Sequence, residues 1–422
     1  MEIEMRRSLP VLASVALVLA AASGGAQAAE FEPDQVPEPA ETFGEPITPV
    51  AAQYVNETYE ALQGTLEAAP DVYGGSYWHT ETESLRIQLR PGADPSQSAQ
   101  LESDVKDVLA GLKESAEVTF AVESASVVDG QAMAEDLGLS TAWAGAQSHA
   151  IKGAYYDVRA SAVTVLVDNA AAGQVEGSLQ HLRTSVPVRI EPIVEAAASD
   201  ELSGEATDAE FGVLSGSRMI DRGGWTAGNT LKSYYTGSHV CSQGFTWRLW
   251  SNNRLYGGIS EDCSNRWSTW ENDGRTVGTV GNVETSVAAG LMGPAAGTSF
   301  NADVWVGGTS TNPNTTDVRP VRSAAGSVVR NAPIAISGAR AGLDSGYITG
   351  PVSATGWPNG LVLVNGINCD NDWGAPFLTT YSDGAVMAHG QAWREPQLNS
   401  NCYYVNVTAI SSALSASIAV VP

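Results

Sequence analysis

Apolar positions in the first half of the chain alternate between helical and strand spacing. Residues 50–68 place apolar side chains three to four positions apart, which predicts an amphipathic helix. Residues 73–78 and 84–90 then alternate like the two strands of a hairpin. A helix over 97–113 and a strand over 116–122 are expected to follow.

The same order of elements recurs further along the chain. A strand that begins over 154–158 is followed by a strand over 162–167, a helix over 171–184 and a strand over 187–190. Two copies of a strand–strand–helix–strand unit predict an α/β region over 48–195. No cluster of catalytic side chains is evident in it.

The pattern changes after residue 217. Short apolar runs now alternate with clusters of Gly, Asn, Ser and Pro about every ten residues, which is typical of an all-β domain. A single amphipathic helix, 408–416, closes the chain, so 218–422 is predicted to be a double β-barrel or a sandwich. The expected strands are 243–249, 254–259, 276–280, 302–306, 317–322, 346–352, 360–365, 375–380, 384–389 and 402–407.

The N-terminus carries an export signal. Arg6 and Arg7 precede an apolar run, 9–22, and the small-residue site Ala26-Gln27-Ala28 follows it. The run is shorter than the ~20 residues that span a bilayer, so 1–28 is predicted to be a cleaved signal peptide of a secreted protein without a membrane span.

Charge divides the remaining chain in the same place as the pattern. Residues 29–217 have 32 acidic and 8 basic side chains, whereas 218–422 have 13 and 12. We expect 29–47, acidic and rich in Pro, to be disordered, and 196–217, small and acidic, to be a linker. Nucleic-acid binding is disfavoured because phosphate contacts need clustered Lys and Arg, and the chain has four Lys.

All four cysteines lie in the neutral half. None has the spacing of a zinc site, so two disulfides formed in an oxidising compartment are expected. The sequence allows three pairings, of which Cys241–Cys263 with Cys369–Cys402 closes the shortest loops.

Two stretches connect the chain with a known family. The segments 153–159 (GAYYDVR) and 163–168 resemble the propeptide of alpha-lytic protease and streptogrisin precursors. The second half matches the protease domain of the same family in order and spacing. The matching segments are Cys241–Phe245, Asn301–Val304, Ser337-Gly338 with Gly342 and Gly346, Cys369–Pro376 and Asn401–Tyr404.

This resemblance implies an α/β propeptide, 48–195, that assists the folding of a chymotrypsin-like, trypsin-like serine protease domain, 218–422. The domain is expected to be an all-β double barrel with a C-terminal helix. The resemblance also implies the two local disulfides named above.

The catalytic groups of the family are replaced. A Ser-His-Asp triad needs a hydroxyl that attacks, an imidazole that accepts its proton and a carboxylate that orients the imidazole. By position the carboxylate is Asp303, but Asp262 stands in the imidazole position and Trp373 in the nucleophile position. The oxyanion loop is altered at Asn371 and Asp372, and the family's Arg appears one place late as Arg340, which leaves its ion pair with Asp372 uncertain.

Two further site hypotheses are weaker. His239 and His389 are the histidines of the neutral half, and each is more readily a packed or exposed side chain than a substitute base. The carboxylates of Asp262, Asp303, Asp370 and Asp372 could in principle hold a hard cation, but they come from distant loops. We expect no metal and no cofactor.

The sequence therefore favours a secreted, monomeric serine-protease homologue without catalysis. Its expected partners are a peptide, inhibitor or protein bound in the former protease cleft and its own propeptide. One alternative is an active endopeptidase with rearranged groups. The other is a cell-wall or glycan-binding module that uses loop tryptophans, namely Trp247, Trp250, Trp267 and Trp270.

Overall fold

The computed structural model describes most of the chain from residue 48 on. All described residues belong to one unit, Thr42–Pro422. The predicted signal peptide, the acidic lead and 196–216 of the predicted linker lie outside them. The described ranges are 48–49, 52–123, 125–193, 217–221, 224–233, 240–266, 269–309, 312–369, 372–398 and 401–421.

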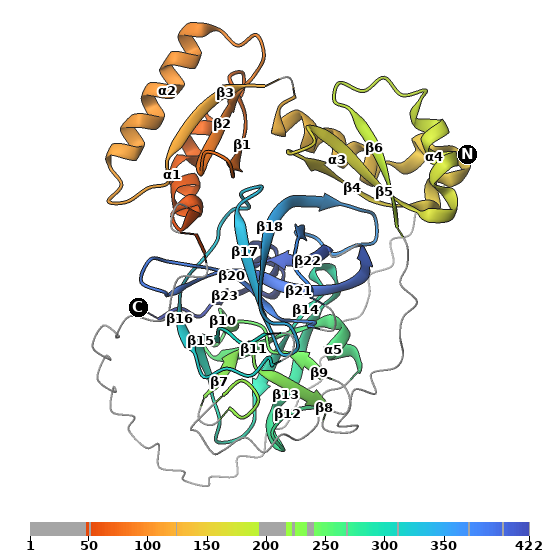
Figure 1. Ribbon diagram of the computed structural model, residues 1–422. Helices are drawn as coiled ribbons and strands as arrows, with labels where there is room; N and C mark the ends of the chain where they lie inside the picture. The colour runs from red at the N-terminus through yellow and green to blue at the C-terminus, as the bar shows by residue number, and fades with distance from the viewer. Residues whose placement is uncertain are drawn as a thin grey trace, which may run out of the picture. The chain divides into compact units, whose positions relative to one another are not determined.

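The N-terminal α/β region, residues 48–193, contains two repeats of helix–strand–strand–helix–strand (orange and yellow in Figure 1). The first repeat comprises α1 (Val55–Glu67), β1 (Tyr73–His79), β2 (Ser84–Leu89), α2 (Pro95–Ala110) and β3 (Val118–Val122). The second comprises α3 (Val127–Leu139), the 3-10 helix η2 (Thr141–Ala150), β4 (Ile151–Asp157), β5 (Ala162–Asp168), η3 (Asn169–Ala171), α4 (Ala172–Leu179) and β6 (Val188–Ile193).

Each repeat forms a small sheet in which a hairpin is extended by a parallel strand. In the first repeat β1 pairs antiparallel with β2, with Trp78 opposite Leu85, and β3 joins β2 in parallel. The second repeat has the same arrangement of β4, β5 and β6. Side-chain caps start α2 and α3: Asp94 accepts the N–H of Ser96 at 2.8 Å before α2, and Ser126 accepts the N–H of Asp129 at 3.0 Å before α3.

Helix α3 was not expected from the sequence. Gly130 and Gly138 interrupt its apolar pattern, and both are needed for close packing. A Cβ on Gly130 would overlap the ring of Tyr156, and one on Gly138 would overlap the carbonyl oxygen of Ser353. The two glycines therefore lower the helix propensity of α3 but allow it to approach its neighbours closely.

The C-terminal domain is built from short strands, as predicted. Its elements are β7 (Trp225–Ala227), β8 (Thr230–Ser233), β9 (Val240–Ser242), β10 (Thr246–Leu249), β11 (Leu255–Ser260), α5 (Glu261–Arg266), β12 (Thr269–Asn272), β13 (Arg275–Glu284), η4 (Thr285–Val287), β14 (Ala289–Pro294), β15 (Phe300–Trp305), β16 (Val318–Ala324), β17 (Pro333–Gly338), β18 (Gly342–Ser353), β19 (Leu361–Asn365), β20 (Pro376–Thr380), β21 (Val386–Leu398), β22 (Asn401–Asn406), α6 (Val407–Leu414) and β23 (Ala416–Ile418).

These strands form two curled sheets. The first has eight strands in the order β23-β10-β11-β14-β13-β12-β8-β9. In the second, β18-β17-β20-β21-β22-β19 pair in turn and β19 returns to β18, which closes a six-stranded barrel. With α6 at its end, the domain is the predicted chymotrypsin-like double barrel.

The α/β region and the barrel domain share one hydrophobic core. Leu62 of α1 and Leu85 of β2 belong to the same buried cluster as Ile334 and Phe377 of the barrel. Strand β4 also pairs antiparallel with β18 over two residue pairs. The barrel sheet thus continues into the second repeat.

Arg330 is a polar connection between the same two parts. Its side chain is buried, and its guanidinium donates hydrogen bonds to the carbonyl oxygens of Tyr156 (3.0 Å) and Thr349 (3.3 Å) and to the amide oxygen of Gln131. Its own carbonyl accepts the N–H of Trp78 at 2.7 Å. Burial lowers the pKa of Arg330 to about 10, so it remains charged at neutral pH.

The tryptophans of the barrel domain are mainly structural. Trp247 and Trp270 are both fully buried, in two different clusters, while Trp250 is 60% exposed. Trp267 lies outside the described residues. Of the tryptophans proposed above for a glycan-binding face, two are therefore core residues and cannot contact a surface ligand.

No helix in the described part of the chain combines the length and apolar character that crossing a membrane requires.

Candidate functional site

Two disulfides lie close in sequence to the residues that were assigned above to the catalytic positions of the family. Cys241 on β9 is joined to Cys263 in α5, with a Cα–Cα distance of 6.5 Å, and Cys369 is joined to Cys402 on β22 at 5.9 Å. The structure thus has the two short-loop pairings that the family resemblance implied. Among the described cysteines none is free.

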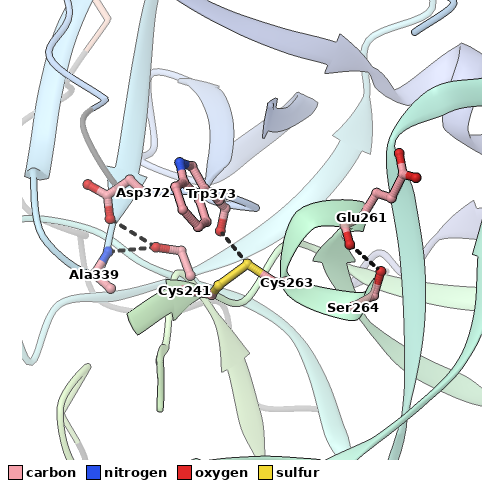
Figure 2. Close-up of a disulfide and its surroundings, with 8 residues drawn as sticks. Cys241, Glu261, Cys263, Ser264, Ala339, Asp372 and Trp373 are labelled. Atoms are coloured by element: carbon pink, nitrogen blue, oxygen red, sulfur yellow. Dashed lines mark hydrogen bonds between the residues drawn. A yellow bond between two sulfur atoms is a disulfide. The ribbon is translucent and has the colours of Figure 1, made fainter. Parts of the chain in front are cut away.

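Trp373 is held by its backbone beside the first of these disulfides. Its carbonyl oxygen accepts the backbone N–H of Ser242 at 3.0 Å, and the Sγ of Cys263 lies 4.0 Å from the same oxygen (Figure 2). The next residue, Gly374, has φ 87°, and a Cβ there would lie 2.6 Å from the carbonyl oxygen of Ser242. Only glycine fits that position.

The indole of Trp373 is half-buried. It packs against a hydrophobic cluster of the first sheet, which includes Cys241, Cys263 and Ile259. A large aromatic side chain therefore packs against the first sheet at the residue that the sequence assigns to the nucleophile position.

The two carboxylates assigned to the triad positions lie on different elements. Asp262 is the second residue of α5, directly before Cys263, and is half-buried. Asp303 lies on β15 and is also half-buried. Burial raises the pKa of Asp303, and burial is its only resolved cause, so the shift need not come from a second carboxylate.

Asp372, next to Trp373, is completely buried and hydrogen-bonded. Its carboxylate accepts the backbone N–H groups of Arg340 (2.8 Å) and Ala341, and the hydroxyl of Ser242 at 3.0 Å. The same hydroxyl accepts the N–H of Ala339 at 2.9 Å (Figure 2). Burial raises the pKa of Asp372, while these donors lower it. Asn371 and Asp370 lie outside the described residues.

The arginine near Asp372 is not the one expected from the family pattern. Arg340 contributes its backbone N–H to the carboxylate. The cation whose charge acts on Asp372 is Arg218, which is fully buried. Sequence reasoning missed Arg218, because a single Arg next to a predicted linker carries no signal of burial.

His389 does not supply a substitute base at these positions. His389, on β21, is 2% exposed, and its Nε2 hydrogen-bonds with Thr379 Oγ1 at 3.0 Å and Asn56 Nδ2 at 3.4 Å. Burial lowers its pKa to about 4, so the imidazole is neutral at neutral pH. His239 lies outside the described residues.

Among the described residues, no group of three or more His, Cys, Asp or Glu side chains is arranged to hold a metal ion. The hypothesis of a cation site built from four aspartates gains no support from Asp372 and Asp303. Asp372 accepts hydrogen bonds from N–H and hydroxyl donors, and among the described residues Asp303 belongs to no group of three or more His, Cys, Asp or Glu side chains that could hold a metal ion.

Two cavities lie in other parts of the described structure. One of about 510 Å³ lies between the loop 325–328 and the start of α6, and His389 forms part of its wall. The other, of about 130 Å³, lies beside the hairpin β17–β18 and the segment Thr48-Pro49. Neither is lined by Trp373, Asp262 or Asp303.

Comparisons with known proteins find similarity only at the level of structure. No protein-family model and no curated protein matches the chain. A solved structure of a serine protease specific for glutamic acid is 17% identical, covers 46% of this chain and 100% of its own, and gives a TM-score of 0.37.

Two other solved structures give similar values. The chymotrypsin of Cellulomonas bogoriensis is 19% identical with a TM-score of 0.36, and protease A of Thermobifida fusca is 17% identical with a TM-score of 0.35. Each covers 46% of this chain and 98% of its own. The fold assignment rests on the strand order described above, and the activities of these proteins are properties of those proteins.

Proposed function

We propose that this protein is a serine-protease homologue that does not catalyse hydrolysis and acts by binding a peptide or protein. The observation that carries the proposal is the side chain of Trp373, an indole packed beside the Cys241–Cys263 disulfide where the family has its nucleophile. An indole has no nucleophilic oxygen and cannot form an acyl-enzyme.

The imidazole position supports the same proposal. Asp262 precedes Cys263, as the family's His precedes its Cys, and a carboxylate that is ionised near neutral pH is a much weaker base than imidazole for a serine hydroxyl. Even a serine placed at 373 would therefore lack its usual proton acceptor. Both changes act on the same step, and together they leave no route for covalent catalysis.

The alternative, an active endopeptidase with rearranged groups, would need another base and nucleophile. Thr379 and His389 are hydrogen-bonded, but both are buried, being 4% and 2% exposed. His79 pairs with the hydroxyl of Thr82 at 2.9 Å at the tip of a hairpin. Neither pair has an acidic side chain hydrogen-bonded to its imidazole among the described residues, so neither resembles a triad.

The N-terminal α/β region is proposed to be a lasting part of the working protein. A homologue that cannot hydrolyse peptides cannot remove this region by itself. The shared core and the hydrogen bonds of Arg330 support its retention, because separation would expose Leu62 and Leu85 and remove two of the three acceptors of a buried cation. The two disulfides are typical of extracellular proteins, and we propose that the protein is secreted.

Activity-based labelling tests the absence of catalysis. The secreted full-length protein is incubated with a fluorophosphonate probe and, separately, with casein and a panel of peptides. We expect no labelling and no turnover above that of a mock secretion. Turnover that copurifies with the protein and is accompanied by labelling would show that it is an active hydrolase.

Binding is tested with the same peptides under conditions where none is cut. The variant W373G, which removes the indole from the site, is the matched comparison. If the former cleft takes the ligand, W373G changes affinity for the peptides that the parent protein binds. Equal affinity for every bound peptide would place binding at another surface.

A further inference from the structure

Residues 217–221, which begin with the last residue of the predicted linker, are hydrogen-bonded to the barrel domain. Ser217 and Ile220 exchange backbone hydrogen bonds of 2.9 and 3.0 Å, and the N–H of Arg218 binds the carbonyl of Thr315 at 3.1 Å. The carbonyl of Arg218 accepts the side chain of Asn272 at 3.2 Å. The segment is therefore part of the folded domain.

The side chain of Arg218 points into the domain and is 0% exposed. One terminal nitrogen, Nη2, donates to the carbonyl oxygens of Trp305 and Gly307, each at 3.2 Å, and to the hydroxyl of Ser337 at 2.6 Å. The other, Nη1, donates to the carbonyl oxygen of Gly338. All four acceptors are uncharged, so they pair the two terminal nitrogens without neutralising the guanidinium, and its buried Nε has no hydrogen-bond partner among the described residues.

Asp372 lies on the other side of the same glycine. A Cβ on Gly338 would overlap the Asp372 carboxylate. Arg340 and Ala341, which follow shortly after this glycine, donate their backbone N–H groups to the same carboxylate. At Gly338, the last residue of β17, the Arg218 guanidinium therefore binds the carbonyl oxygen, and the Asp372 carboxylate lies against the Cα. A buried charge is costly unless an opposite charge is near, and each of these two supplies it for the other.

We propose that Arg218 is the fixed counter-ion of Asp372, and that the loop carrying Asp372 and Trp373 is held in place by a cation from the junction between the two halves of the chain. The conformation of the former active-site loop then requires no cleavage of that junction. Any protease that separates the halves must leave Arg218 attached to the C-terminal part.

A double-mutant cycle in the full-length protein tests the pairing. R218M keeps the bulk of the side chain and removes the charge, and D372N removes the opposite charge. Each single variant is expected to be less stable, because each leaves one buried charge unpaired. The double variant should be more stable than the two single effects predict, with a coupling of about tenfold or more in the unfolding equilibrium constant.

R340M is the matched control, because Arg340 holds Asp372 through its backbone and not through its guanidinium. R340M and D372N should combine additively. Additivity of R218M with D372N, to within about twofold, would overturn the proposal. If R218M alone is not secreted, secretion of R218M/D372N supports it, and failure of that double variant while D372N is secreted contradicts it.

The proposed pairing also limits where a protease can cut the junction between the two halves of the chain. The secreted protein is digested with a panel of proteases at low concentration, and the N-termini of the stable C-terminal fragments are read by mass spectrometry. Fragments should start at or before Arg218. A stable folded fragment that starts at Met219 or Ile220 would show that Arg218 is dispensable.

Discussion

The backbone N–H of Ser242 donates a hydrogen bond of 3.0 Å to the carbonyl oxygen of Trp373, while the hydroxyl of Ser242 donates to the carboxylate of Asp372. One serine on β9 thereby fixes two consecutive residues of the loop that contains Asp372 and Trp373. The loop is held by its backbone and by Asp372, so the identity of the side chain at 373 can change without loss of the loop's conformation.

Because the backbone of this loop is fixed independently of the side chain at 373, we expect that a serine can be placed there, together with a histidine at 262, to test the assigned catalytic positions. D262H should remain unlabelled by a fluorophosphonate because it lacks a nucleophile, and W373S should react very slowly because it lacks a base. The double variant D262H/W373S should be labelled at least about a hundredfold faster than W373S, which is the lower range of general-base assistance. Labelling is measured by mass spectrometry of residue 373.

The control for this experiment is D262H/W373A, which has the base without a hydroxyl. If the double variant folds with an unchanged thermal midpoint and yet reacts no faster than W373S, then Asp262 does not occupy the position of the base. The assignment of the triad positions from the family pattern would then be wrong.

The second disulfide is predicted to contribute strongly to the stability of the barrel domain. Cys369 and Cys402 are 33 residues apart, and removing a cross-link of that span costs about 3–4 kcal/mol in the chain-entropy description. C369A/C402A should lower the free energy of unfolding by that order, as measured by urea titration. C241A/C263A, which opens a span of 22 residues, should cost a similar amount, and a negligible effect of either pair would contradict the prediction.

Arg330 allows a test of how firmly the α/β region is attached. R330M should destabilise the protein by about 3 kcal/mol, because it leaves the carbonyl oxygens of Tyr156 and Thr349 without their buried donor. Faster amide exchange in α3 and β4 would be the accompanying local change, measured by mass spectrometry.

R322M is the comparison for R330M. Arg322 forms an ion pair with Asp383 in which the side chains are 47% and 53% exposed, so its loss should cost less than about 1 kcal/mol. Equal effects of R330M and R322M would show that the buried arginine does not join the two parts.

The pattern of apolar positions predicted most of the helices and strands of the two halves of the chain. Burial of one face of a helix or strand leaves a regular spacing of apolar residues in the sequence. Helix α3 left no such period, since Gly130 and Gly138 are set by contacts with Tyr156 and Ser353 rather than by helix propensity. Its neighbours come from distant parts of the chain. A local pattern cannot report them.

The candidate site likewise has features that the sequence predicted and one that it did not. The sequence predicted the disulfide pairs, because the spacing of the cysteines carries that information through the family resemblance. The assignment of Asp262 and Trp373 to the catalytic positions stays a prediction. Arg218 was not predicted, although it is among the largest fully buried side chains. A charged residue is usually exposed, and only the three-dimensional neighbours of Arg218 show why this one is not.

His389 predicts how stability depends on pH. Its pKa in the folded protein is about 4, below the ordinary value of 6.5. Between these two values the unfolded chain binds a proton that the folded protein does not, so stability falls as the pH decreases from about 6.5 to about 4. The full difference corresponds to about 3 kcal/mol.

The variant H389Q isolates this contribution, since glutamine can keep a hydrogen bond to Thr379 and does not titrate. Other groups oppose it: burial raises the pKa values of Glu57 and Glu60 on α1, which favours the folded state as these carboxyls become protonated in acid. Urea titrations at pH 7.5, 6, 5 and 4.5 should therefore show that acidification costs the parent protein more than it costs H389Q. Parallel pH profiles for the two proteins would mean that His389 takes up its proton in the folded state as readily as in the unfolded chain.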